Sequence, residues 1–449
     1  MDGVRLVRAR ALVGVASLGL AVLVGCSKDG GAKGAAANAG PYAKEVSEAV
    51  PKIERAVGLR FKTPPRVERR SKEEVRNFLM KKFNESMPAA EISGIERTYR
   101  RFGLISDTLQ LRPFMLELLT EQVVGYYDPA TKVLYVVDGA DPAMVGVTVT
   151  HELVHALQDQ YLNLDSIQKV TGDNDRQVAA QAVIEGQATF EQVKAMLGSN
   201  SLSATLPGGW DRIRDMIREG QSSMPVFSSA PMIIQETLIF PYLSGAEFMR
   251  HFDETHPGKV PFDSMPVSTE QILHQSAYFE TRDDPTTVTL PELGGGAHSV
   301  YSNNLGEFET RLFLFQHLGD QNAAIRGAAG WDGDRYVLFD TKGGDGIVWV
   351  TVWDSKIDAG EFYDLVDTSL LKRFRNAKPK AADEASRTYE AGGRTIRVTT
   401  AEIAGRPVVL YVDVPTGAPT DAIDLSKVTL RDYLGAQRHP ERSEGSSGS

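Results

Sequence analysis

The stretch Thr148-Val-Thr-His151-Glu152-Leu-Val-His155-Ala-Leu157 decides how the rest of the chain is interpreted. Residues four apart on an α-helix lie on one face, about 6 Å apart along the axis. His151 and His155 can therefore direct two imidazoles at one cation, and Glu152 lies about 100° round the helix from His151. The positions between and beside them are uncharged, as a buried helix requires, and Asp141 and Pro142 fit its cap and first turn.

This spacing is the HExxH arrangement found in zinc hydrolases, in which two neutral imidazoles bind the metal and the glutamate accepts a proton from water. The alternative is a buried helix with two hydrogen-bonded histidines and a capping glutamate. The uncharged flanks favour the metal site.

A second helix is predicted from 176 to 197, and it contains Glu185 on a face of small and apolar residues. A carboxylate buried there needs a cation or a strong donor, so Glu185 is the predicted third ligand. Gly186 and the neighbouring alanines are expected to let this helix approach the first one closely. The competing acids have other expected roles: Asp173 and Asp175 as helix caps, and Glu191 as a surface residue beside a lysine.

His151-Glu152-Leu-Val-His155 followed by Glu185-Gly-Gln-Ala resembles the gluzincin metallopeptidases, the thermolysin-like branch. The resemblance spans roughly residues 120–197 and implies a zincin-like domain with zinc held by His151, His155 and Glu185. It also implies that Glu152 is the general base. Thr189 stands where these enzymes often carry an aspartate, so Asp159 is the candidate hydrogen-bond partner of one histidine.

Zinc peptidases also need a donor for the developing oxyanion, commonly a His or Tyr from a later segment. Ser268 and Gln271 predict a helix start there, and His274 and Tyr278 follow one turn apart. These two are the candidate donors, with Tyr242 as a further one. Chance placement of all three remains the open alternative.

The amino terminus has the features of a signal peptide, with Arg5, Arg8 and Arg10 before a short apolar run from Ala11 to Val24. Leu23-Val-Gly-Cys26 resembles a bacterial lipobox, in which the cysteine is lipidated. We therefore expect a signal peptide at 1–25, a flexible tether at 26–41 and a lipid-anchored protein of the bacterial cell envelope, facing the periplasm or the exterior. A secreted protein with a free thiol is the alternative. With one cysteine, the chain forms no internal disulfide and no sulfur-ligated zinc site.

Composition places the 449 residues among ordinary globular proteins, and a formal charge of −10 without a basic patch argues against a nucleic-acid partner. The predicted fold class is α+β. A mainly helical zincin-like domain with a small edge sheet is expected at 42–293. After the glycine run at 294–296, a carboxyl-terminal α+β module is expected to 436, followed by a disordered tail at 437–449.

Periodicity predicts the individual elements. Helices are expected at 42–57, 71–85, 90–104, 109–123, 298–327 and 358–376. Strands are expected at 123–127, 133–137, 336–339, 347–353, 395–400 and 408–414. The first two strands form a hairpin whose edge could pair with a peptide substrate. The segment 330–334 is expected to be a turn, and its acidic residues leave calcium binding as an alternative, although the spacing is not that of an EF-hand.

The sequence thus favours a lipid-anchored zinc peptidase that acts on a protein or peptide outside the cytoplasm. A non-catalytic lipoprotein, a binding or assembly factor with a structural or vestigial zinc site, is the alternative. A structural site would be closed by four protein ligands, whereas a catalytic one keeps a position for water. A latent enzyme is also compatible with the sequence.

Overall fold

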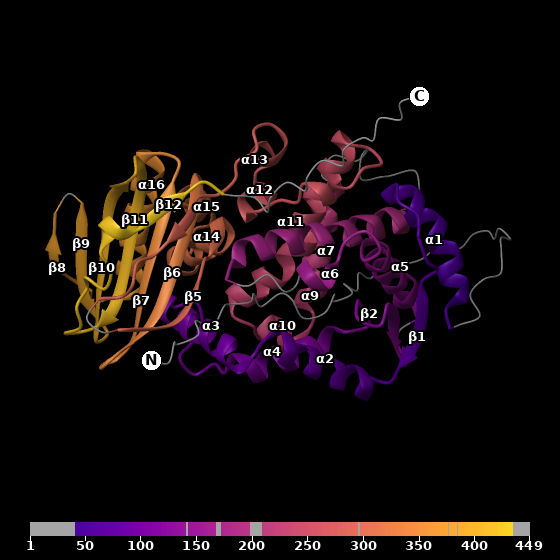
Figure 1. Cartoon of the computed structure of the whole chain (residues 1–449). Helices are drawn as coiled ribbons and strands as arrows, with labels where there is room; N and C mark the ends of the chain where they lie inside the picture. The colour runs from indigo at the N-terminus through magenta and orange to yellow at the C-terminus, as the bar shows by residue number, and fades with distance from the viewer. Residues whose placement is uncertain are drawn as a thin grey trace, which may run out of the picture.

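The computed structural model describes residues 41–140, 142–167, 172–197, 209–294, 297–375, 377–383 and 385–433. The fold is α+β, as predicted, with a helical part beside a large antiparallel sheet built from later residues (Figure 1). Cys26, the predicted signal peptide and the predicted tail lie outside the described residues, and so does the capping position Asp141. Among the helices that are described, none combines the length and apolarity needed to cross a membrane.

The four helices predicted for the amino-terminal part are confirmed. Ser71 caps the second of them in a capping box, because its hydroxyl accepts the Glu74 amide and the Glu74 carboxylate accepts the Ser71 amide. The helices of this part are α1 (Ala43–Val57), α2 (Lys72–Ser86), α3 (Ala89–Phe102), α4 (Leu111–Gln122), α5 (Pro142–Gln158), α6 (Leu164–Ile167), α7 (Asn174–Leu197), α9 (Gly209–Ser222), α10 (Pro225–Ser229), α11 (Met232–Thr255), η1 (Pro261–Asp263), α12 (Thr269–Leu273) and α13 (Gln275–Phe279).

A small sheet lies directly before the HExxH helix in the chain. Its strands β2 (Gly125–Asp128) and β3 (Val133–Val137) form the predicted hairpin. A third strand, β1 (Arg66–Arg70), pairs in parallel with β3, which gives the order β1-β3-β2. The sequence did not predict β1, because its charged residues form no alternating apolar pattern and its partner is more than 60 residues away.

The later residues form a seven-stranded sheet with the order β5-β6-β7-β11-β10-β9-β8, and every neighbouring pair is antiparallel. A two-stranded sheet pairs β4 with β12. The elements of this module are β4 (Thr287–Thr289), β5 (His298–Asn303), α14 (Gly306–Leu318), α15 (Gln321–Ala328), β6 (Trp331–Thr341), β7 (Gly344–Trp353), α16 (Lys356–Arg373), β8 (Lys378–Ala382), β9 (Ser386–Ala391), β10 (Arg394–Ile403), β11 (Arg406–Pro415), η2 (Leu425–Lys427) and β12 (Thr429–Arg431).

Alternation along the central strands gives the large sheet two covered faces. On β7, Ile347, Trp349 and Trp353 pack in the core that includes α14, α15 and α16. The intervening Val348 and Val350 point to the opposite face, where β4 and the segment around β12 cover them. Both faces are therefore buried, which accounts for the almost continuous apolar sequence of this strand.

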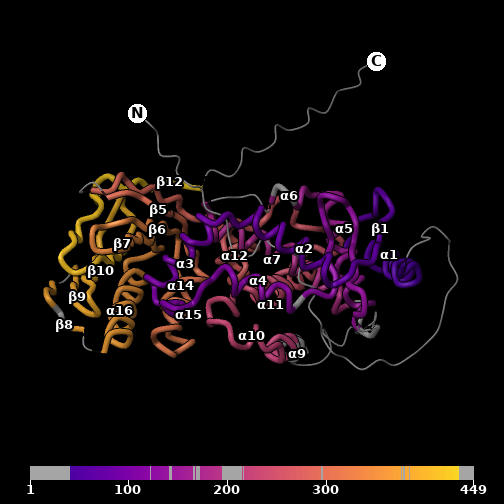
Figure 2. The backbone as a smooth tube through the Cα atoms, turned by 90° about the horizontal axis from the view of Figure 1, so that it is seen from below, coloured from indigo at the N-terminus to yellow at the C-terminus, as the bar shows by residue number. Residues whose placement is uncertain are grey.

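The main core continues from the helical part into the sheet module. On α3, Tyr99 and Phe102 are buried in the same cluster as Trp349, and the Phe102 and Trp349 rings are 5.2 Å apart in an edge-to-face arrangement. Figure 2 shows α3 beside β5, β6 and β7. The two predicted domains thus share one core cluster across their boundary.

Two predicted elements of the module are wrong in part. Residues 298–303 form the edge strand β5, and the helix predicted from 298 begins only at Gly306, which has a φ of 71°. The expected turn at 330–334 belongs largely to β6. Its Asp334 carboxylate accepts the backbone amides of Leu305 and Gly306 and the Trp349 indole N–H, so it holds α14 against the sheet and offers no calcium loop.

Candidate metal centre

The helices α5 and α7 bring the predicted ligands together in the interior. His151, His155 and Glu185 are each at most 1% exposed. The side of α5 that points away from these histidines carries Val149 and Leu153, and it packs in the same cluster as α1. Because α1 covers this far side of α5, it supports the site helix from behind.

The three donor atoms converge on one point. The Nε2 atoms of His151 and His155 are 3.1 Å apart, and the Glu185 Oε2 atom lies 3.2 Å from the first and 3.3 Å from the second. Within the described residues, no further His, Cys, Asp or Glu side chain joins this group. The described part of the chain thus offers three such ligands.

The hydrogen-bond partners of the two imidazoles fix which ring nitrogen can bind a cation. His151 Nδ1 donates to Gln192 Oε1 at 2.9 Å, and His155 Nδ1 donates to Gln158 Oε1 at 2.8 Å. An amide oxygen only accepts, so each ring carries its hydrogen on Nδ1 and leaves a lone pair on Nε2. The Gln158 amide group is itself oriented, because its nitrogen donates to the Ile184 carbonyl at 3.0 Å.

This donor set fits a zinc ion. Two imidazole lone pairs and a carboxylate oxygen face one another with no hydrogen between them, an arrangement that only a cation or an added proton stabilises. Zinc bonds of about 2.0–2.1 Å at tetrahedral angles separate the donor atoms by about 3.3 Å, close to the separations present here. His₂Glu sites of this kind leave a fourth position for water.

The pKa shifts of the ligands describe the same demand for positive charge. Burial lowers the pKa of His151, and the hydrogen bond to Glu185 offsets part of this effect. Burial acts in the same direction at His155, but the charge of Glu185 outweighs it and raises the pKa of His155 to about 9. Burial opposes the charge of Glu185, but His155 and the two imidazole hydrogen bonds lower its pKa to about 2. The buried carboxylate and the two imidazoles thus share a demand for positive charge that a divalent cation would meet.

Glu152 lies beside the three ligands, and only one of its two carboxylate oxygens has a hydrogen-bond partner. Its Oε2 accepts the backbone amide of Tyr127 in β2 at 2.8 Å, while its buried Oε1 has no hydrogen-bond partner. Burial raises the pKa of Glu152 to about 8, and the positive charge of His155 offsets part of this effect. The carboxylate is therefore fixed in orientation and keeps one oxygen available for a proton.

The partner expected for one histidine is elsewhere. Asp159 accepts the Tyr127 hydroxyl at 2.8 Å and the Lys132 ammonium at 2.6 Å, so it fixes the hairpin to the end of α5. Gln158 and Gln192 take the role expected of Asp159. Asp159 lies just beyond the carboxyl end of α5, and the hairpin residues Tyr127 and Lys132 engage its carboxylate instead.

A third glutamine completes this layer, since Gln181 donates to Glu185 Oε1 at 2.8 Å. None of the three glutamines was predicted from the sequence. The spacing that could have found them is present: Gln181 precedes Glu185 by four residues, Gln192 follows it by seven, and Gln158 follows His151 by seven. Such positions share a helix face with the ligand.

Gly186 lies on the side of α7 that packs on α11, and this corrects its expected role. A Cβ atom on Gly186 would lie 2.1 Å from the Gly245 carbonyl carbon of α11. Gly186 therefore permits the contact between α7 and α11 rather than the contact with α5. The approach brings Tyr242 of α11 over His151, with ring centroids 6.2 Å apart.

The structure does not bring His274 and Tyr278 to the metal ligands. His274 Nε2 contacts Glu307 at 2.9 Å and Arg311 at 3.0 Å, and the Tyr278 hydroxyl donates to the Ser264 carbonyl at 2.7 Å. Both residues follow α12, which begins at Thr269, and the Thr269 amide donates to Asp175 at the start of α7. Ten residues of helix, about 15 Å, separate Asp175 from the ligand Glu185. Of the three candidate donors, Tyr242 is the one beside the site.

Three acids, one just before α7 and two on it, were expected from the sequence to be helix caps or surface residues. Asp173 caps the helix as predicted, since it accepts the Arg176 amide at 3.2 Å. Asp175 is no cap of α7: it is buried and accepts the Thr269 amide at 2.9 Å. Glu191 is not a surface residue but is 5% exposed, and burial raises its pKa to about 7 despite the nearby Lys194.

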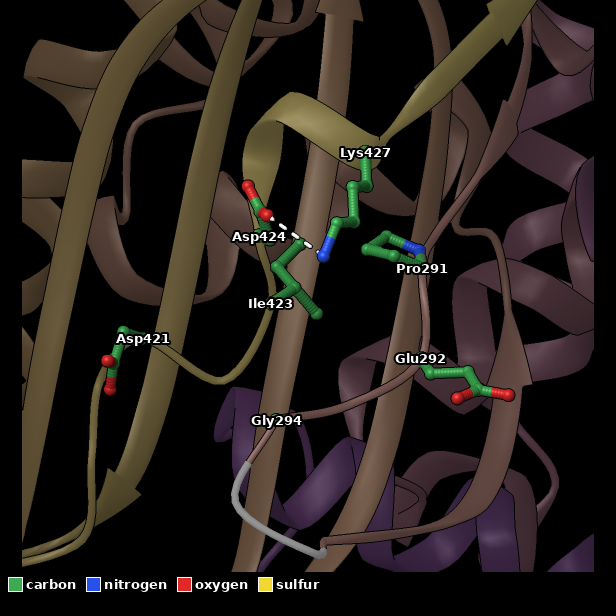
Figure 3. Close-up of a pocket in the computed structure, with 7 residues that line it drawn as sticks. All are labelled: Pro291, Glu292, Gly294, Asp421, Ile423, Asp424 and Lys427. Carbon is green, nitrogen blue, oxygen red and sulfur yellow. Dashed lines mark ion pairs between the residues drawn. The ribbon is translucent and has the colours of Figure 1, made fainter.

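A separate cavity of 560 Å³ lies on the sheet module (Figure 3). Figure 3 shows Lys427 and Asp424 on one side, joined by a 3.3 Å ion pair, and Pro291 opposite them. The lining residues are Pro291, Glu292, Gly294, Asp421, Ile423, Asp424 and Lys427. None of them belongs to α5 or α7, so this cavity is distinct from the metal centre.

Comparison with known proteins identifies one region. Residues 293–424 match a family model described as a domain of unknown function, DUF8575. The match covers most of the sheet module and leaves out α5 and α7. No curated protein and no solved structure matches the chain.

Proposed function

We propose that the protein is a zinc-dependent peptidase, lipid-anchored through Cys26 at the outer side of a bacterial membrane. The observation that carries the proposal is the convergence of His151, His155 and Glu185 donor atoms within 3.3 Å beside Glu152. The anchor and the location rest on the sequence alone.

Glu152 has the position that a general base requires. The Tyr127 amide holds one carboxylate oxygen, and the unpartnered Oε1 can accept a proton from water and pass it to a leaving amine. A zinc ion held by the three ligands supplies a Lewis acid that acidifies water and polarises a carbonyl group. The glutamines keep the ligand rings in the required tautomer and orientation.

The strand β2 supports a peptide as the substrate. It is an edge strand in the order β1-β3-β2, and its Tyr127 amide points away from β3 toward Glu152. An extended peptide that paired with this edge would run past the Glu152 carboxylate. Tyr242, over the ring of His151, is the candidate oxyanion donor.

Complete burial of the site favours a second candidate function. His151, Glu152 and His155 are at most 1% exposed, so a substrate reaches them only when the surrounding segments move. A non-catalytic lipoprotein with a structural metal site would need no such opening. The two functions differ in whether the folded, metal-bound protein hydrolyses a peptide.

The test uses the full chain, with metal content measured on the purified protein and casein digestion followed with and without a chelator. We expect about one zinc per chain and hydrolysis that the chelator abolishes. Glu152→Gln should keep the zinc and lose at least about 100-fold in rate, because general-base catalysis contributes about 10²–10⁴-fold. The exposed Glu219→Gln is the matched control.

Wild-type rates in Glu152→Gln would refute the role of Glu152. A chain that binds zinc stoichiometrically and digests neither casein nor a peptide library would support the structural site instead.

A further inference from the structure

A second group of potential metal ligands lies where the helical part meets the sheet module. Glu270 is on α12, Asp283 lies between α13 and β4, and Asp354 follows the end of β7. One carboxylate oxygen from each lies within 4.8 Å of the other two. In Figure 1, α12 lies between the helices around α11 and the sheet module. We call these three residues the acidic cluster.

The acidic cluster has no protein counter-charge. Over the described ranges, no Lys, Arg or His side chain forms an ion pair with any of the three carboxylates, and none of them has a hydrogen-bond partner. Glu270 is only 5% exposed. A buried carboxylate with carboxylate neighbours and no donor is unfavourable unless it is protonated or bound to a cation.

A fourth carboxylate, that of Glu307, lies near the acidic cluster. Glu307 on α14 is fully buried, and its Oε1 contacts Arg311 and His274, while its Oε2 has no hydrogen-bond partner. Burial, and next the charge of Glu307, raise the pKa of Glu270 to about 10, so the two carboxylates lie close together. The charge of Glu307 also contributes to the raised pKa of Asp354. Glu307 thus adds a further buried carboxylate, with one unpartnered oxygen, to the surroundings of the acidic cluster.

The chemistry of the donors selects the ion. All the donors are carboxylate oxygens, which suit a hard cation and offer no nitrogen or sulfur ligand for zinc or copper. Calcium binds six to eight oxygens at about 2.3–2.6 Å, so two ligands on opposite sides of one ion are up to about 5 Å apart. Asp283 is partly exposed and Asp354 is exposed, so water can complete the coordination shell.

We propose that the acidic cluster binds a calcium ion that joins α12 to the sheet module. The ion would connect three chain segments at the point where Asp175, at the start of α7, already accepts the Thr269 amide of α12. Calcium binding would therefore stabilise the attachment of the module to the helix that carries Glu185. The ion would contribute to stability and take no part in hydrolysis.

The test measures calcium binding on the full chain, with zinc held at one equivalent so that the histidine site does not change. After other metals have been removed, we expect about 5 mM calcium to raise Tm by about 3 °C or more, and magnesium to do less. Terbium should give luminescence sensitised by tryptophan, since Trp353 precedes Asp354 directly. Excess calcium should displace it.

Two variants and a control make the test specific. Asp354→Asn should lose the calcium response, and Glu270→Gln should lose it while raising Tm in chelator, because the amide replaces a carboxyl group that is costly to bury. The exposed Asp421→Asn should respond as the wild type does. An unchanged Tm with calcium, or wild-type terbium binding in both cluster variants, would overturn the proposal, and the buried acids would then be protonated carboxyls. Hydrolysis plays no part in any of these readouts.

Discussion

The contact between α7 and α11 gives the most direct test of how packing positions the site. Gly245 lies so close to α7 that a Cβ atom would be 2.0 Å from the Ala182 carbonyl oxygen. Ordinary contact begins at 3.4 Å, so Gly245→Ala must separate the helices by about 1.4 Å. Both sides of the contact are backbone, and no side chain can rotate away. We expect a loss of about 1–3 kcal/mol in unfolding free energy, the usual effect of overpacking.

The same displacement should reach the ligands, because α7 packs on both α11 and α5 and Glu185 is adjacent to Gly186, the partner of Gly245. Metal sites tolerate ligand shifts of only about 0.2 Å, so zinc affinity should fall as well.

The matched control is Gly146→Ala on α5, which is exposed and has open space around the added Cβ atom. It should stabilise the protein by about 0.5–1 kcal/mol through helix propensity. Thermal unfolding and a zinc competition titration measure the two effects. If Gly245→Ala unfolded at the same temperature as Gly146→Ala and bound zinc like the wild type, the packing argument would be refuted.

Two further predictions concern buried polar groups. Gln158→Leu removes the acceptor of the His155 Nδ1 hydrogen and should weaken zinc binding by about 10–100-fold in a competition titration. The control Gln160→Leu, away from the ligands, should leave zinc binding unchanged. Equal effects of the two substitutions would contradict the role of Gln158. Burial raises the pKa of Glu309 to about 7, so the folded protein holds that proton more tightly than the unfolded chain. The contribution of this proton to the unfolding free energy is therefore complete below about pH 4.5 and is lost as the pH rises through 7. Glu309→Gln should gain stability relative to the wild type between pH 5 and 8, by up to about 3 kcal/mol in chemical unfolding, and parallel pH profiles would argue against it.

Local patterns predicted the elements whose partners are close in sequence. The helices α1 to α4 and the hairpin of β2 and β3 follow from apolar spacing, caps and a turn. The strands β1 and β5 were missed because their pairing is set by distant residues, and a short charged or polar strand carries no period of its own. The large sheet was recognised only through its most apolar strands.

The residues of the candidate site likewise comprise those that local patterns predicted and those that they did not. His151, Glu152 and His155 follow from helix geometry, and Glu185 from the cost of a buried charge. His274 was a mistaken candidate because helix spacing describes only one face of one element. The path of the chain through α11 placed Tyr242 beside His151, whereas α12, which precedes His274, contacts the start of α7 at Asp175, about 15 Å of helix away from Glu185.

By itself the sequence determined which atoms could bind a metal ion, because a period of 3.6 residues and the chemistry of imidazole and carboxylate act over a few residues. Only the tertiary structure decided what surrounds them: the glutamines that orient the ligands, the glycine contact that sets the distance between α7 and α11, and the acids gathered from three segments at α12. These depend on the packing of segments far apart in the chain, where the free energy of a contact is shared among many side chains and no short pattern records it.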